Sequence, residues 1–214
     1  TQIMGRSDKD TLYASQILYP CMQAADIFYL NADICQLGMD QRKVNVLARE
    51  LGPKLGFWKP IAVHHHMLMG LGEPPKGDAT VERAIAMKMS KSNPNSAIFM
   101  TDSNEDVVRK LRKAYCPEKQ ANDNPILEYC KYIVFEKVDT FVIERPEKFG
   151  GDVTFNSYSD LENSFVKGEV HPADLKTATA KYINELLEPV REYFKKNSKA
   201  RKLKEQVESF KVTR

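Results

Sequence analysis

The stretch ICQLGMDQRKVNVLARE, residues 34–50, decides the fold class of this chain. It begins within a β-like run that we place at residues 32–37, and Gly38-Met39-Asp40-Gln41 then turns the chain. The next segment carries apolar residues at the i, i+3, i+4 and i+7 spacing of a helix with one buried face, namely Val44, Leu47, Ala48 and Leu51. Strand, glycine turn and helix together predict half of a βαβ unit.

A second β-branched run, Ile61-Ala62-Val63, follows this helix after a Gly/Pro-rich break. Strands that alternate with helices predict a parallel sheet with crossover helices, so the first part of the chain is expected to be α/β. Later apolar spacing is mainly helical, as at residues 102–115 and in a long helix from Pro172. Asp102 and Glu105 have the spacing of a capping box at the start of the first of these helices. We therefore predict an α/β region over residues 1–102 and a mostly helical region over residues 103–214.

The first helix, predicted within residues 12–30, is rich in apolar residues and is expected to be largely buried, with Pro20 at a first helical position. Tyr19, Gln23 and Asp26 are spaced by four and then three residues, which places them on one side of this helix. A buried carboxylate and amide need hydrogen-bond partners, which the protein or a ligand would supply. A helix end that faces solvent is the alternative that the spacing leaves open.

Composition limits the class of protein. The 214 residues are 42% hydrophobic and 29% charged with a formal net charge of +3, as in a soluble globular protein. No apolar run approaches the ~20 residues of a membrane-spanning helix, so we expect a cytoplasmic protein without a membrane partner. The four cysteines are far apart in sequence, which favours reduced thiols. Because the chain starts at Thr1, we expect a fragment or a processed product.

The turn at residues 38–41 lies where open α/β sheets bind ligands, and its carboxylate, Asp40, suits ribose hydroxyls. Four residues are a weak motif, and a turn in which Asp40 only caps the next helix is the alternative favoured without further context. The run His64-His65-His66 does not predict a metal site, because successive strand residues point to opposite faces of a sheet. One or two of these histidines are expected to line a nucleotide pocket or to pack beside it.

The segment KMSKSNPNS, residues 88–96, is a poor helix or strand and is typical of an anion-binding loop. Lys88 and Lys91 are compact cations on long stems, and Ser90 and Ser92 add hydroxyl donors, so the segment suits a polyphosphate. The G-x-x-x-x-G-K pattern of a P-loop is absent, which indicates a different phosphate chemistry. An exposed loop without a role is the alternative.

Two further segments are basic. In the helix predicted around residues 106–113, a basic face is expected opposite an apolar one. The basic residues are Arg109, Lys110, Arg112 and Lys113, and the apolar residues are Val107, Val108, Leu111 and Ala114. The last twenty residues, 195–214, hold eight Lys or Arg. Such segments either form solvated surfaces or bind phosphate groups, and for the tail the two readings have about even odds.

Five stretches occur in a fixed order along the chain: YPCMQAADIFYL (19–30), ICQLGMDQRKVNVLARE (34–50), KMSKSNPNSAIF (88–99), FGGDVTFNSY (149–158) and HPADLK (171–176). This ordered set resembles the second half of the tyrosyl-tRNA synthetases of the archaeal and eukaryotic type, a family of class I aminoacyl-tRNA synthetases. The resemblance covers nearly the whole chain. It implies the C-terminal half of a Rossmann-like catalytic domain over residues 1–102, followed by a mostly α-helical anticodon-binding domain over residues 103–214.

The resemblance also implies a site for tyrosine. Tyr19, Gln23 and Gln41 would hold the amino group of the amino acid. Asp26 would accept a hydrogen bond from the phenolic hydroxyl.

A site for ATP is implied by the same match. Gly38 and Asp40 would contact the adenylate, and Met69 would border the adenine. The motif that would bind the triphosphate consists of Lys88, Met89, Ser90, Lys91 and Ser92. Both lysines would be catalytic, because they would stabilise the departing pyrophosphate, with Mg²⁺ assisting and no metal held by protein ligands.

For the second half of the chain, the resemblance implies contacts with the anticodon of tRNA(Tyr). Phe149 would stack on the first anticodon base, Asp174 would hydrogen-bond it, and His171 would approach the next base, in the way that proteins usually read single-stranded nucleotides. The basic helix and the basic tail would contact phosphates. The family also implies a homodimer.

The sequence departs from the family pattern in two places. Leu37 stands where the family more usually has a glycine before Gly38, and the early His-x-Gly-His signature does not occur in these 214 residues. An N-terminal half of the catalytic domain would therefore be a partner of this chain. A non-catalytic tRNA-binding module of the same family is one alternative. A tryptophanyl-tRNA synthetase is another, but Asp26 favours tyrosine, since a site built to bond a hydroxyl rejects ligands that lack it.

Overall fold

A computed structural model describes residues 13–75, 87–89 and 93–210 of the chain. The chain divides into two compact units: the first comprises residues 1–68 and 74–88, and the second residues 69–73 and 89–214. The boundary between the units therefore falls inside the KMSKS motif, between Lys88 and Met89. The division of roles predicted at residue 102 stays a prediction.

The first unit contains a pair of parallel strands with helices, as the βαβ pattern predicted. Its elements are α1 (Ala14–Tyr29), β1 (Ile34–Gly38), the 3₁₀ turn η2 (Met39–Gln41), α2 (Arg42–Leu51), the 3₁₀ turn η3 (Pro53–Leu55) and β2 (Ile61–His65). Strands β1 and β2 pair in parallel from Ile34 opposite Ile61 to Gly38 opposite His65. Parallel pairing brings the carboxyl ends of both strands to one edge, where a ligand site is expected.

The core of the first unit lies between α1, α2 and β1. Ala24 and Ile27 of α1 pack with Cys35, Val44 and Ala48, and each of these side chains is buried. Burial of Val44 and Ala48 confirms the apolar face predicted for the second helix, except at its end, where Leu51 is 41% exposed. The hydrophobic effect of this small cluster is what holds the helices against the strands.

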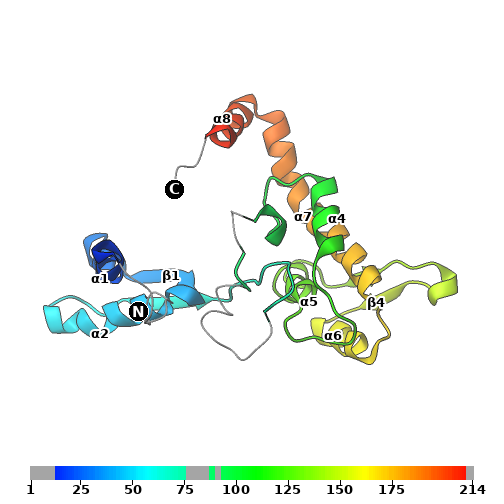
Figure 1. Cartoon of the computed structure of the whole chain (residues 1–214), viewed down its shortest axis with the longest axis horizontal. Helices are drawn as coiled ribbons and strands as arrows, with labels where there is room; N and C mark the ends of the chain where they lie inside the picture. The colour runs from blue at the N-terminus through cyan, green and yellow to red at the C-terminus, as the bar shows by residue number, and fades with distance from the viewer. Residues whose placement is uncertain (1–12, 76–86, 90–92, 211–214) are drawn as a thin grey trace. The chain divides into compact units, whose positions relative to one another are not determined.

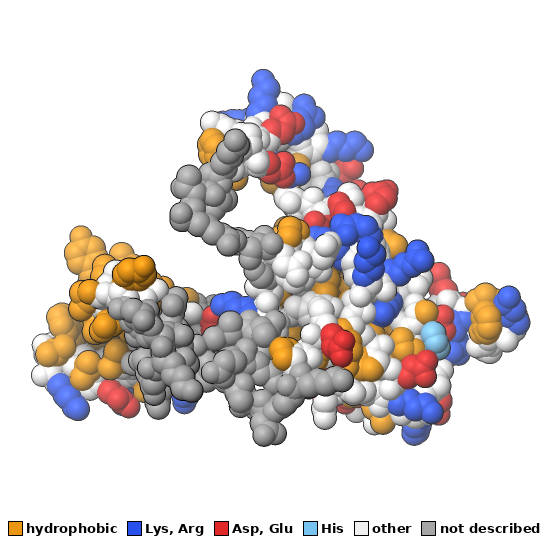
Figure 2. All heavy atoms as spheres, in the orientation of Figure 1, with side chains coloured by type: hydrophobic (Ala, Val, Ile, Leu, Met, Phe, Trp, Pro, Cys, Tyr) orange, Lys and Arg blue, Asp and Glu red, His pale blue; other side chains and the backbone are white. Residues whose placement is uncertain are grey.

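Helix α1 is much more exposed than predicted. Only Pro20, Ala24 and Ile27 are buried on it, whereas Ile17 and Met22 are 57% and 64% exposed. Figure 2 shows hydrophobic side chains gathered over this helix, whose place is labelled in Figure 1. One face of α1 packs on α2, and no described part of the first unit covers the other face. The expected position of Pro20 was also wrong, because the helix begins at Ala14 and Pro20 lies inside it.

The second unit is mostly helical. Its helices are α4 (Asn104–Lys113), α5 (Pro125–Tyr129), the π-helical turn η5 (Cys130–Val134), α6 (Tyr158–Lys167), α7 (Pro172–Lys196) and α8 (Ser198–Ser209). Short 3₁₀ turns are η4 (Pro94–Ser96) and η6 (Glu147–Phe149), and an antiparallel pair joins β3 (Phe141–Ile143) to β4 (Val153–Phe155). No helix in the described part of the chain has both the length and the hydropathy to cross a membrane.

The core of the second unit is larger than that of the first. Leu111 of α4, Leu161 and Phe165 of α6 and Leu175 of α7 are fully buried in one cluster. Helices α4 and α7 lie side by side, as Figure 1 shows. This core therefore holds α4, α6 and α7 together.

We predict that Leu161→Ala destabilises the second unit by about 2–5 kcal/mol, because truncating a fully buried leucine leaves a cavity that its neighbours only partly fill. Leu203→Ala is the matched control, since Leu203 is 53% exposed on α8 and its truncation is expected to cost less than ~0.5 kcal/mol. Denaturant titration monitored by far-ultraviolet circular dichroism measures both. Equal losses in the two variants would contradict the placement of the core.

Candidate active site

The turn after β1 places the first set of polar side chains. Gly38 ends the strand, and η2 then carries Asp40 and Gln41 into the start of α2. A Cβ atom at Gly38 would overlap the sulfur of Met67 and would lie 2.7 Å from Asp40 Oδ1. Glycine at this position therefore leaves room for the Asp40 carboxylate beside the strand end.

A chain of hydrogen bonds joins four of the side chains singled out in the sequence. Gln23 Nε2 donates to Gln41 Oε1 at 2.9 Å, and the Gln41 side chain bonds the Asp40 carboxylate. Lys88 Nζ donates to Asp40 Oδ2 at 2.7 Å. All four residues belong to the first unit. Residues that are as much as 65 positions apart thus meet in one polar cluster, which we call the Gln23–Lys88 cluster.

The electrostatics of this cluster centre on Asp40. The hydrogen bond from Lys88 lowers the pKa of the Asp40 carboxyl below its usual value, and it outweighs the desolvation that would raise that pKa. The pair is only partly shielded, since the side chains of Lys88 and Asp40 are 52% and 32% exposed. An ion pair at this exposure is weak and can exchange with other partners.

One acceptor of the cluster has no partner. Oε1 of Gln23 is buried and makes no hydrogen bond within the described residues, although Nε2 of the same amide is bonded to Gln41. A buried acceptor without a donor costs free energy, so a ligand that brings an N–H group would be favoured there.

Tyr19 and Asp26, predicted to act with Gln23, lie on the same helix and are exposed, with Tyr19 at 59%. In this structure both side chains face solvent, as in the alternative to a buried position. Their exposed side is part of the uncovered face of α1.

The predicted ATP contacts divide between the two units. Lys88 belongs to the first unit, whereas Met89 packs against the core of the second. Met69 is buried in the second unit, where its N–H donates to Glu128 Oε2 at 2.9 Å. The remaining predicted contacts, Ser90, Lys91 and Ser92, lie outside the described residues.

The histidine run follows the second strand. His64 Nε2 lies 3.0 Å from the amide nitrogen of Asn45, a buried residue of α2, and His65 pairs with Gly38 in the strand register. Within the described ranges, no three His, Cys, Asp or Glu side chains are grouped so that they could hold a metal ion.

The turn between β3 and β4 presents Phe149. This side chain is 63% exposed at the end of η6, with the ammonium of Lys148 5.0 Å from its ring centroid. Gly150 and Gly151 both have positive φ, at 96° and 71°, which only glycine adopts readily. The two glycines therefore allow the tight turn that leads from η6 to β4.

Arg145 holds this turn in place, although no sequence pattern singles this residue out. Its Nε donates to the Gly151 carbonyl at 3.0 Å and its Nη1 to the Glu169 carbonyl at 3.2 Å. It thus ties the turn to the segment that leads into α7.

His171 and Asp174 lie at the start of α7. His171 is its N-cap, and the ring Nδ1 accepts a hydrogen bond from the Ala173 N–H at 3.1 Å. Asp174 is in the first turn, where a carboxylate interacts favourably with the helix dipole. His171 is also within 3.6 Å of Glu118, a contact that is an ion pair only when the imidazole is protonated.

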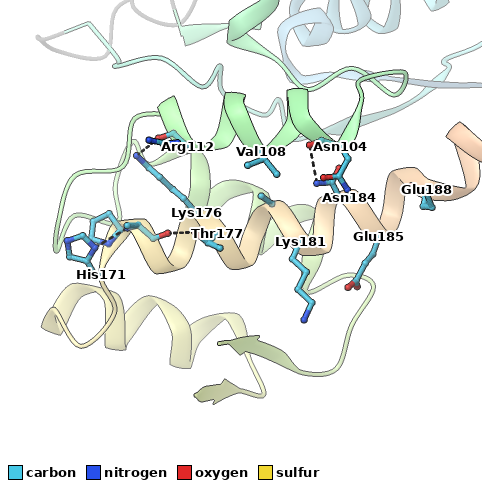
Figure 3. Close-up of a pocket in the computed structure, with 13 residues that line it drawn as sticks. Asn104, Val108, Arg112, His171, Lys176, Thr177, Lys181, Asn184, Glu185 and Glu188 are labelled. Atoms are coloured by element: carbon cyan, nitrogen blue, oxygen red, sulfur yellow. Dashed lines mark hydrogen bonds between the residues drawn. The ribbon is translucent and has the colours of Figure 1, made fainter. Parts of the chain in front are cut away.

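A groove of about 790 Å³ runs along α4 and α7 from His171. Figure 3 shows Val108 directed from α4 toward α7, and Lys176 directed toward the end of α4. Lys176 Nζ donates to the Arg112 carbonyl at 3.3 Å. The lining mixes apolar side chains with Arg and Lys at the rim.

The basic surfaces differ in part from expectation. Figure 2 shows Lys and Arg gathered over the region of α4 and over α8, and the predicted tail forms helix α8 over most of its length. Lys110 was wrongly assigned to the basic face of the predicted helix, since it is 4% exposed. Val108, expected on the apolar face, is 44% exposed. A position between Val107 and Leu111 at helical spacing was the signal that could have placed Lys110 in the core.

The family of the chain follows from comparison with known proteins. A family model described as tRNA synthetases class I (W and Y) matches residues 1–188. The chain therefore belongs to this family of class I tRNA synthetases, whose fold is α/β with substantial helical content.

Individual relatives point to the tyrosine branch. The chain is 50% identical to tyrosine–tRNA ligase 1, cytoplasmic, of Arabidopsis thaliana over 214 residues, which are 100% of this chain and 53% of that protein. The crystal structure of tyrosyl-tRNA synthetase complexed with L-tyrosine from Pyrococcus horikoshii matches with a TM-score of 0.84 at 44% identity, over 94% of this chain and 58% of that one. The chain thus spans little more than half the length of each.

A tryptophan-specific structure is a weaker match. Tryptophanyl-tRNA synthetase from Aeropyrum pernix K1 has a TM-score of 0.59 at 18% identity, over 88% of this chain and 49% of that one, which shows a shared fold alone. The resemblance to archaeal and eukaryotic tyrosyl-tRNA synthetases is therefore confirmed.

We predict that Lys88→Met raises the pKa of the Asp40 carboxyl toward its usual value, because the ammonium that lowers it is removed. In the parent, the contribution of the pair to stability is complete above the usual carboxyl pKa and is lost as the pH falls through the lowered pKa of Asp40. Carbon-13 NMR titration of the aspartate carboxyls measures this change.

Asp106 provides an internal control in the same titration. Its pKa is lowered mainly by hydrogen bonds from Arg109 and Ser103, so Lys88→Met should leave it unchanged. An Asp40 pKa that stays in place while Lys88 is absent would contradict the pairing.

Proposed function

We propose that this chain is the C-terminal part of a tyrosine–tRNA ligase. The complete protein would activate tyrosine with ATP to tyrosyl-adenylate and would transfer the tyrosyl group to tRNA(Tyr). In this proposal residues 1–102 form the second half of a Rossmann-like catalytic domain, and residues 103–214 form a helical anticodon-binding domain. An N-terminal portion would supply the rest of the nucleotide site.

The Gln23–Lys88 cluster is the observation that carries this proposal. It connects Gln23 and Gln41, the proposed contacts of the amino acid, to Asp40 and Lys88, the proposed contacts of the nucleotide. An enzyme that joins the carboxylate of an amino acid to the α-phosphorus of ATP must hold the two substrates side by side. The cluster provides adjoining polar groups for both.

In the tyrosine pocket, the unpartnered Oε1 of Gln23 would accept a hydrogen bond from the ammonium group of the substrate. Tyr19 and Gln41 would complete the contacts to that group. Asp26 would accept from the phenolic hydroxyl, and the N-terminal portion would cover the exposed face of α1 around it. Covering this face would remove both side chains from water and strengthen their hydrogen bonds.

In the nucleotide pocket, Asp40 would accept hydrogen bonds from the ribose hydroxyls, beside Gly38, while Met69 and Met89 would lie near the base and the phosphates. Lys88 would release Asp40 and bind a phosphate oxygen, and Lys91 would bind another. Ser90 and Ser92 would add hydroxyl donors.

The reaction needs no protein nucleophile. A carboxylate oxygen of tyrosine attacks the α-phosphorus, and pyrophosphate leaves with the electron pair of the broken P–O bond. Lys88 and Lys91 would stabilise the charge that develops on the leaving group, which raises the rate when that contact is stronger in the transition state than in bound ATP. Mg²⁺ would enter with ATP as part of the substrate and would neutralise further phosphate charge.

In the second half of the chain, Phe149 would stack on the first anticodon base, Asp174 would bond its edge, and His171 would approach the next base. The exposure of Phe149 and the bracing by Arg145 support this assignment. Basic side chains of α4 and α8 would contact phosphates. By its family, the complete protein would be a cytoplasmic homodimer.

The direct test is tyrosine-dependent ATP–pyrophosphate exchange, measured in a full-length protein that carries these 214 residues. We expect exchange with tyrosine and none with tryptophan. Asp26→Ala should lose most of the preference for tyrosine over phenylalanine, because that preference rests on bonding the hydroxyl. A preference of about 10⁴–10⁵ is known for this enzyme family itself.

Exchange with tryptophan in place of tyrosine would overturn the assigned substrate. Unchanged selectivity in Asp26→Ala would overturn the role of that carboxylate. Binding of tRNA without any exchange would favour the non-catalytic module. Asp33→Ala is the matched control, since Asp33 precedes β1 outside the proposed pocket and its loss should leave selectivity as in the parent.

A separate prediction concerns the anticodon. Phe149→Ala should weaken tRNA(Tyr) binding by about 1–3 kcal/mol, the usual contribution of one stacked base, without changing tyrosine-dependent exchange. Phe210→Ala removes an aromatic ring of similar exposure just after α8 and serves as the control. Filter binding at fixed ionic strength measures the affinity, and equal losses in both variants would contradict base stacking by Phe149.

A further inference from the structure

Lys110 is the most deeply buried lysine in the described part of the chain. Its side chain is 3% exposed on the inner face of α4, in a helix whose neighbouring Arg109 and Arg112 face outward. A buried ammonium is costly unless it is fully partnered, so a lysine in this position needs a physical reason.

The partners of Lys110 all come from one short segment. Nζ lies 2.6 Å from Asp102 Oδ2, donates to the Ala97 carbonyl at 3.0 Å, and stands 4.6 Å from the centroid of the Phe99 ring. Asp102 Oδ2 also accepts from the Phe99 N–H at 2.9 Å. The ammonium thus organises residues 97–102 around itself.

Three further contacts hold this part of the chain to the second unit. Arg109 Nη1 donates to Asn95 Oδ1 at 2.8 Å, and the Leu71 N–H donates to the Ser96 carbonyl at 3.0 Å. From α7, Arg191 Nε donates to the Asp102 carbonyl at 2.9 Å. All of these residues belong to the second unit.

Residues 93–102, which include this segment, follow the KMSKS motif directly. Met89, before the three undescribed residues of the motif, packs on the core of the second unit, and Asn95, three residues after them, accepts a hydrogen bond from Arg109 of α4. The described residues that flank this gap therefore belong to the second unit. Lys88, by contrast, is bonded to Asp40 in the first unit.

We propose that Lys110 is a positioning residue for the activation of tyrosine with ATP. Its buried ammonium fixes residues 97–102 against α4 and thereby sets the position of the KMSKS motif that precedes them. This inference rests on the proposed function. Lys110 touches no substrate and acts through the backbone of Ala97. A misplacement of about 1 Å in a catalytic group can reduce the rate about 100-fold, so a fixed attachment point is functionally significant.

The test uses Lys110→Met in a full-length protein that carries this chain, because methionine keeps an unbranched side chain one atom shorter than that of lysine and removes its charge. We expect kcat for tyrosine-dependent ATP–pyrophosphate exchange to fall about 10- to 100-fold. KM for tyrosine should stay within about twofold of the parent, because the proposed tyrosine contacts belong to the first unit. Lys137→Met, at an exposed lysine after η5, is the matched control and should retain the parent kcat.

A second variant separates positioning from stability. Lys110→Met alone leaves the Asp102 carboxylate without its cation, so the variant is also expected to lose thermal stability. Adding Asp102→Asn removes that charge and keeps an oxygen for the Phe99 N–H. We expect the double variant to regain stability but to keep the low kcat, since Ala97 still lacks its donor.

Hydrogen–deuterium exchange provides a readout that does not depend on activity. Amides of residues 93–102 should exchange faster in both variants than in the parent, while those of α6 remain protected. A parent protein without ATP–pyrophosphate exchange would refute the proposed function. The amide measurement would still test whether Lys110 attaches residues 97–102 to α4. Parent-like kcat in Lys110→Met, full recovery of kcat in the double variant, or unchanged protection of residues 93–102 would each overturn the inference.

Discussion

Parallel pairing of β1 with β2 is the constraint on which the first unit depends. Because the two strands run in the same direction, Gly38 and His65 end at one edge, and the residues that follow each strand meet there. The absence of a side chain at Gly38 then leaves space for Met67 and the Asp40 carboxylate. Asp40 and Gln41 follow β1 at this edge, and there they bond Lys88 and Gln23, so the place of the polar cluster depends on where the strand ends.

The sequence was informative where a pattern is local. The stretch at residues 34–50 gave strand, turn and helix because its apolar period changes from two to 3.6 at a glycine, and burial of Val44 and Ala48 confirmed the helix face. The parallel pair followed from the same pattern. The contact between Gln23 and Gln41, however, was predicted only from family resemblance, because no local rule relates positions eighteen residues apart.

Predictions failed where burial depends on other parts of a protein. Helix α1 has the composition of a buried helix, yet several of its apolar side chains lie on a face that no described part of its unit covers. Composition reports how apolar a helix is, but it does not report which of its faces another element covers.

The residue predicted to cap α4 was wrong for a related reason. Asp102 was expected to open a capping box, but Ser103 caps the helix and the Asp102 carboxylate bonds Lys110 instead. Both residues are good caps, so propensity could not choose between them. The carboxylate of Asp102 bonds the buried ammonium of Lys110 and therefore does not cap the helix. A single sequence gives little sign of a cation in the core beyond its place between apolar neighbours.

The two lysine–aspartate pairs of this chain show how burial suits an ion pair to one of two tasks. The pair of Lys88 and Asp40 is 52% and 32% exposed, so breaking it costs at most about 1 kcal/mol and both groups are available to a ligand. The pair of Lys110 and Asp102 is 3% and 11% exposed, and separating it would leave a charge in a region of low polarity.

The first pair includes Lys88, the first residue of the KMSKS motif, and the second joins Asp102 and Lys110, which follow the end of the motif by ten and eighteen residues. An exchangeable contact is needed where a lysine must leave a protein partner and bind a phosphate. A permanent contact is needed where a backbone segment must keep its position while that exchange occurs. The same chemical pair can therefore act as a ligand-binding group at Lys88 and as an attachment point at Lys110, and the difference follows from the exposure of each.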